Sequence, residues 1–165
     1  MAGQAGQAGQ AARIAHLLDK LGRGVLDELQ GLPDDALNRV LPLPETNTLY
    51  ALATHILGAG EFWSLAMAGA RPMERDRPAE FRARGTLADL VPRYERWLAD
   101  AHTALDALSD EALAQPVTPP AEFRPFGDEP MTLGDCLLHA VDHTALHLGH
   151  IQLTRQQSRP TQQPT

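Results

Sequence analysis

The chain has little cysteine and no long apolar run, and each shortage excludes a class of protein. Cys136 is the single cysteine among 165 residues, so no disulfide can form within the chain, and a reducing compartment is favoured. No apolar run approaches the roughly 20 residues that a membrane-spanning helix needs. The N-terminus also lacks the apolar core of a signal peptide. We therefore expect a cytoplasmic protein with no membrane partner.

Basic residues are also scarce. Fourteen lysines and arginines stand against 21 aspartates and glutamates, which gives a net charge of -7. Proteins that bind nucleic acid need a cationic surface to neutralise phosphates. The sequence therefore predicts no nucleic-acid partner. The apolar fraction of 43% is ordinary for a globular protein, and the length fits one domain.

The two ends of the chain differ from its middle. Residues 2–10 repeat the triplet AGQ three times, and residues 156–165 are polar and contain two prolines. Segments of this kind bury too little apolar surface to offset the entropy lost on ordering. We predict a disordered N-terminal segment at 1–11, one folded domain at 12–155 and a disordered tail at 156–165.

Within the predicted domain, apolar residues recur at spacings of three and four, which is typical of amphipathic helices. Four segments show this pattern, at about 12–30, 47–69, 86–105 and 132–155. Thr86 and Thr132 each precede an aspartate by three residues, as in a helix capping box. The connections are rich in proline or charge and are predicted to be loops with at most short helical turns. No segment alternates as a strand would, so the fold class is all-α, a four-helix bundle.

Histidines gather on one face of the last predicted helix. At about 100° per residue they lie within an arc of roughly 80°. These are His139, His143, His147 and His150. Histidines four apart stand one turn above each other, about 6 Å apart, so two imidazoles can bind one metal ion. The spacing leaves open which pair would do so: 139 with 143, 143 with 147, or 147 with 150.

A further ligand would have to come from another helix, where His16, His55 and His102 are the candidates. His55 lies in the middle of the second predicted helix, close to its apolar stripe. His102 has aspartates on either side and is expected to face solvent. A lone histidine near an apolar face is more often a hydrogen-bonded boundary residue than a ligand. Several imidazoles on one face favour a metal, because burying them without a partner is costly.

One segment of the last helix resembles a known motif. The run HTALHLGHIQ, residues 143–152, is similar to the last-helix motif of the DinB/YfiT-like superfamily: His, three residues, His, any residue, Gly, then Gln or His. Residues 31–63 are similar to that superfamily's approach to its second helix, and the likeness covers most of 12–155. The sequence departs from the pattern at Gly58 and Gly60, near which the superfamily often has an acidic residue. The resemblance therefore gives no carboxylate neighbour for a metal site at that position.

The resemblance implies a four-helix bundle with up-down-down-up topology that is often a homodimer. It implies a divalent metal ion, zinc or nickel, held by three histidines. Carried over residue by residue, these ligands are His55, His143 and His147. It also implies a stress-associated S-transferase, whose partners are a small-molecule thiol, mycothiol or bacillithiol, and an electrophile.

Two neighbours of these histidines are given provisional roles. His150 is the first candidate for a catalytic residue, as a general base acting through a water. Cys136 is read as a small buried apolar residue. Two other functions stay open: a hydrolase that uses a metal-activated water, and a non-enzymatic metal-binding or stress-associated bundle.

Overall fold

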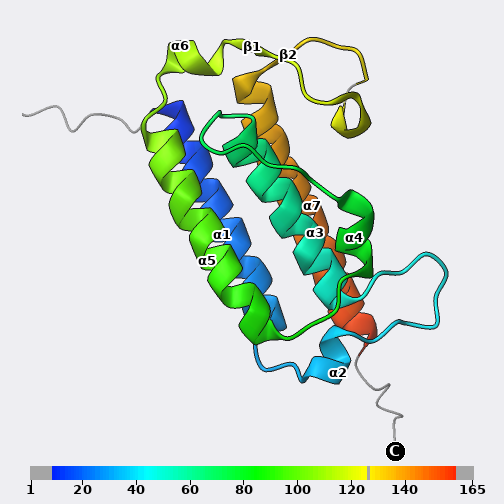
Figure 1. Ribbon diagram of the computed structural model, residues 1–165. Helices are drawn as coiled ribbons and strands as arrows, with labels where there is room; N and C mark the ends of the chain where they lie inside the picture. The colour runs from blue at the N-terminus through cyan, green and yellow to red at the C-terminus, as the bar shows by residue number, and fades with distance from the viewer. Residues whose placement is uncertain (1–8, 126, 159–165) are drawn as a thin grey trace, which may run out of the picture.

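The computed structural model describes residues 9–125 and 127–158 (Figure 1). Most of the two predicted disordered segments lies outside these residues. The first helix begins at Gln10 and the last ends at Gln157. The early start has a physical reason, because Ala11 is buried in the core and gives this end of the helix apolar contacts.

Helices dominate the described chain, and the predicted all-α class is confirmed. The long helices are α1 (Gln10–Leu29), α3 (Leu49–Glu61), α5 (Leu87–Asp106) and α7 (Leu133–Gln157). The short helices are α2 (Asp34–Leu37), α4 (Arg77–Arg82), α6 (Asp110–Leu113) and the 3-10 turn η2 (Ala121–Phe123). None of the described helices is long and apolar enough to cross a membrane.

The four long helices form the predicted up-down-down-up bundle (Figure 1). α1 and α7 run in one direction, and α3 and α5 run in the other. α1 packs against both α5 and α7, and α3 packs against the same two helices from the opposite corner. The short helix α4 lies against the outer side of α3. This arrangement puts the middle of α3 between α4 and α7.

Local chemistry fixes where two of the helices begin. Thr86 and Asp89 form the predicted capping box at the start of α5, and Thr132 and Asp135 form the one at α7. In each, the threonine side chain accepts from the aspartate N–H, and the carboxylate accepts from the threonine N–H. These bonds satisfy amide groups that the first helical turn leaves without partners. α7 therefore has a defined start, which sets the height of its histidines.

α3 is the most deeply buried element, and its residues from Leu49 to Gly60 are all buried. The second predicted helix was expected to run to about Gly69, but the α-helix ends at Glu61 and continues as one π-helical turn, η1 (Phe62–Ala66). Within this turn, the Ser64 hydroxyl donates to the Gly60 carbonyl and accepts from the Trp97 indole N–H at 3.0 Å. The wide turn thus provides a partner for a fully buried tryptophan.

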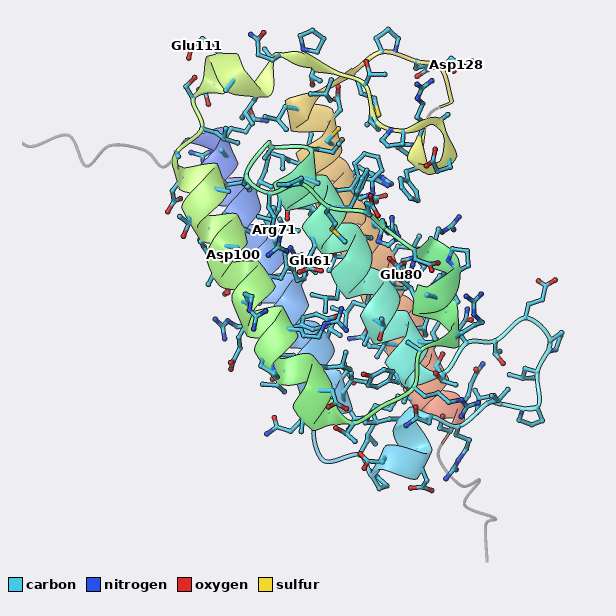
Figure 2. The ribbon with its side chains drawn as sticks, viewed as in Figure 1. Glu61, Arg71, Glu80, Asp100, Glu111 and Asp128 are labelled. Carbon is cyan, nitrogen blue, oxygen red and sulfur yellow. The ribbon has the colours of Figure 1, made fainter. Side chains whose placement is uncertain are left out.

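The long connections are more ordered than the sequence suggested. Pro116–Val117 (β1) and Met131–Thr132 (β2) pair as two short antiparallel strands, although no strand was predicted. Two residues are too few to show an alternating pattern, so the sequence could not reveal them. The 71–85 connection is tied down by Arg71, which bridges Glu61 and Asp100 (Figure 2).

Candidate metal centre

Three histidines from two helices meet between α3 and α7. His55 comes from the buried middle of α3, and His143 and His147 come from successive turns of α7. One ring nitrogen from each histidine lies within 4.8 Å of those from the other two, so this group could hold a metal ion. The structure thus brings together the three side chains that the resemblance singled out, including the pair at 143 and 147. His16, which is exposed, and His102, which is half-buried, do not join them.

His55 is oriented by a carboxylate that the sequence did not single out. Its Nδ1–H donates to Glu80 Oε2 at 2.8 Å, because a carboxylate can only accept. The Nε2 atom of His55 therefore carries the lone pair, and it faces His143 Nε2 at 3.0 Å. A carboxylate behind a histidine ligand fixes its tautomer and strengthens it as a donor. Glu80 lies between α4 and α3 in Figure 2.

Arg75 holds Glu80 in this position. Its Nε donates to Glu80 Oε1 at 2.8 Å and its Nη2 to Oε2 at 2.9 Å, a bidentate pair in which both side chains are almost completely buried. Burial alone would raise the pKa of Glu80, but the hydrogen bonds from His55 and Arg75 outweigh it and lower that pKa. Glu80 is therefore ionised when His55 donates to it.

The backbone of α3 makes room for this carboxylate. A Cβ atom at Gly58 would collide with Glu80 Oε1, so only glycine allows the side chain to lie against the helix. α4, which carries Glu80, is capped by Asp76 and has Pro78 in its first turn. The sequence lacks the acidic residue that the superfamily often has near Gly58 and Gly60 on this helix. At Gly58 the structure explains the difference, because the carboxylate of Glu80 reaches the site from α4 instead of from α3.

His143 and His147 are present as neutral imidazoles. Burial, followed by the charges of neighbouring histidines and arginines, lowers the pKa of His143 to about 2 and that of His147 to about 4. The Nδ1 atom of His143 is buried and has no hydrogen-bond partner among the described residues. Neutral imidazole is the form that binds metal ions. Three nitrogen donors, one of them backed by a carboxylate, fit a divalent metal ion.

The other histidines of α7 flank this group. His150 is exposed, and its Nδ1 lies 3.1 Å from Nδ1 of His147. His139 lies edge-on against Trp63, with ring centroids 4.9 Å apart, and lines a cavity. Cys136 is fully buried, and burial raises the pKa of its thiol to about 11, so it stays protonated at neutral pH. The reading of Cys136 as a buried apolar residue agrees with this position.

Two cavities open onto the histidines from different sides. The first, of about 250 Å³, is lined by His55, His143, His139, Trp63, Phe123 and Pro125 together with Arg75, Arg77, Glu122 and Arg124. The second, of about 350 Å³, includes His147 and His150. A ligand in the first cavity would touch two of the three clustered histidines. The centre is thus reachable although His55 itself is buried.

Comparison with known proteins identifies the family. The profile of the DinB superfamily matches residues 12–151, and the chain therefore belongs to this superfamily. Its structure is similar to the crystal structure of a conserved protein from Enterococcus faecalis. The TM-score is 0.71 at 16% sequence identity, over 92% of this chain and 98% of that chain. This likeness shows the shared fold. No curated protein matches the chain.

Sequence reasoning missed Glu80 and Arg75, which lie in a segment, residues 71–85, that is charged throughout. Periodicity cannot tell which charged residue of such a loop turns inward. One signal was available: Gly58 lies inside a helical pattern, where glycine costs up to about 1 kcal/mol relative to alanine. An interior glycine of this kind often marks a close approach by another group.

Proposed function

We propose that this protein is a metal-dependent S-transferase that joins a low-molecular-weight thiol to an electrophile. His55, His143 and His147 would hold a divalent ion, zinc or nickel, and the thiol, of the mycothiol or bacillithiol kind, would be the co-substrate. The observation that carries the proposal is the convergence of three imidazoles beside a cavity large enough for a small molecule.

A divalent ion held there would lower the pKa of a nearby thiol and so favour the thiolate at neutral pH. In the transfer, the sulfur forms a bond to an electrophilic carbon, and the bond from that carbon to its leaving group breaks. The leaving group departs with the bonding electron pair. The thiol proton goes to a base.

The chain's own residues have distinct parts in this scheme. Glu80 and Arg75 hold His55 in one tautomer, so that its Nε2 lone pair stays directed at the centre. His150 is the proposed proton acceptor, through a water, since it lies beside His147 in the second cavity. Trp63 and Phe123 line the first cavity and would exclude water from it.

The first test is metal content, measured by elemental mass spectrometry on untagged protein, for wild type and His143→Ala. We expect about one equivalent of zinc or nickel in wild type and a loss of it in the variant. The loaded protein is then assayed for conjugation of monobromobimane to mycothiol or bacillithiol. Ester hydrolysis that needs no thiol would instead indicate a hydrolase. Metal uptake without either activity would indicate a metal-binding bundle. A wild type that binds no metal would exclude all three.

A further inference from the structure

The lining of the first cavity contains three arginines, Arg75, Arg77 and Arg124, and one carboxylate, Glu122. Arg75 is neutralised by Glu80, with which it forms a bidentate ion pair. Arg124 is paired with Asp128, so Arg77 is the lining arginine that no ion pair holds within the described residues. The chain as a whole has a net charge of -7, so a cavity wall that carries three arginines stands out against an acidic molecule.

Arg77 is the arginine best placed to bind a ligand. It is exposed, and no ion pair holds it within the described part of the chain. Its guanidinium lies over the ring of Phe81, 5.8 Å from the centroid, which directs the side chain along the cavity wall. Arg124 is paired with Asp128, whose side chain is 99% exposed. An ion pair with so exposed a partner contributes little, so Arg124 can exchange Asp128 for a ligand while its Nε keeps its hydrogen bond to the Pro119 carbonyl at 2.9 Å.

The space around these arginines extends beyond the histidines. A neighbouring cavity of about 680 Å³ shares Arg75, Arg77, Glu122 and Phe123 with the first. It adds Asp76, the exposed residue that caps α4, and the side chains of Pro78 and Phe81. Its walls thus combine Arg77 and two carboxylates, Asp76 and Glu122, with apolar and aromatic surface. A small molecule could reach from the histidines past Phe123 to Arg77.

We infer that the thiol substrate carries a carboxylate, and that Arg77, assisted by Arg124, binds this carboxylate while the sulfur lies at the histidines. The inference rests on the proposed function, because it assigns the thiol to the first cavity. Arginine binds carboxylates through paired, charge-assisted hydrogen bonds, which gives direction as well as affinity. Glu122 and Asp76 would oppose an anion and therefore limit the affinity.

Binding of two small thiols to the cobalt-loaded full chain tests this without relying on turnover. 3-Mercaptopropionate carries a carboxylate, and 2-mercaptoethanol is uncharged. The near-ultraviolet absorbance that develops when a thiol binds cobalt gives a dissociation constant for each. We expect Arg77→Gln to raise the dissociation constant of 3-mercaptopropionate by about threefold to tenfold. The dissociation constant of 2-mercaptoethanol should not change. Arg124→Gln should have a smaller effect, and Glu122→Gln should strengthen 3-mercaptopropionate.

Arg82→Gln is the matched control, because Arg82 is an exposed arginine on the same helix that does not line the cavities. It should leave both constants unchanged. The proposed carboxylate site is wrong if Arg77→Gln leaves the ratio of the two dissociation constants unchanged, or if Arg82→Gln changes this ratio equally. Binding of thiols at the metal would still be supported in either case. If neither thiol changes the cobalt spectrum, the proposed function itself fails, and this inference fails with it.

Discussion

Gly58 and Gly60 lie two residues apart on α3, and each admits a side chain from a different neighbouring helix. Gly58 faces Glu80 of α4, and Gly60 faces the indole of Trp97 of α5. A Cβ at position 58 would collide with the Glu80 carboxylate, and a Cβ at position 60 would collide with the Trp97 ring. The first approach brings a charged group that orients His55. The second fills the apolar core with a fully buried ring. The same residue type thus serves the metal centre on one side of α3 and packing on the other.

The two close approaches also contribute differently to the free energy of folding. Glu80 and Arg75 are a buried ion pair, whose attraction is largely offset by the loss of hydration, so they add little net stability. Trp97 makes its contribution by removing a large apolar surface from water and by its hydrogen bond to Ser64. Changes at Gly58 should therefore alter metal binding most, and changes at Gly60 should alter folding most.

The largest expected effect is on metal affinity. Gly58→Ala should lower the affinity for zinc by about 10-fold to 100-fold, because Glu80 must move away from His55 and histidine ligands depend on such partners. Competition with a chromogenic chelator measures the constant. Gly149→Ala is the matched control, since a Cβ there meets nothing within 4 Å. Equal affinities in the two variants would show that Glu80 does not support the centre.

The second effect is on folding. Gly60→Ala should lower the free energy of unfolding of the metal-free protein by about 1–2 kcal/mol, since an overpacked core typically costs 1–3 kcal/mol and the gain in helix propensity returns part of it. Urea denaturation followed by circular dichroism measures it. Zinc affinity should change less than in Gly58→Ala. A Gly60→Ala protein as stable as wild type would mean that Trp97 can repack freely.

The smallest effect is the pH dependence of folding. The pKa of His143 is lowered to about 2 in the folded protein, against about 6.5 in an unfolded chain. Between these values the unfolded chain binds the proton and the folded protein does not, so stability falls as pH falls below about 6.5. From pH 7 to 5.5 the metal-free protein should lose about 1.3 kcal/mol through this residue.

His143→Leu should remove that part of the pH dependence, and His16→Gln, a change at an exposed histidine of α1, should leave it intact. Urea denaturation at the two pH values measures both. Gly60→Ala should be destabilised about equally at pH 7 and pH 5.5, because its effect lies in the apolar core. A pH dependence that survives in His143→Leu would have to come from other groups.

Much of the molecule could be predicted from the sequence, because its determinants are local. Apolar residues at spacings of three and four, with the capping boxes at Thr86 and Thr132, define the long helices. The four-residue spacing of His143 and His147 follows from the helical period alone. The spacing did not indicate which two histidines of α7 would bind a metal ion. The resemblance to a known family indicated His143 and His147, with His55 as the third ligand.

Only the tertiary structure shows which residues orient the three histidines and which cavities lead to them. Glu80 is separated from His55 by 25 positions, and no local pattern indicates which carboxylate of a charged loop will be buried. The close approach at Gly58, the lowered pKa of His143 and the arginines of the cavity all depend on how α4, α7 and the 121–125 segment pack against α3. Periodicity fixes which face of a helix a residue occupies, but only packing decides what that face meets.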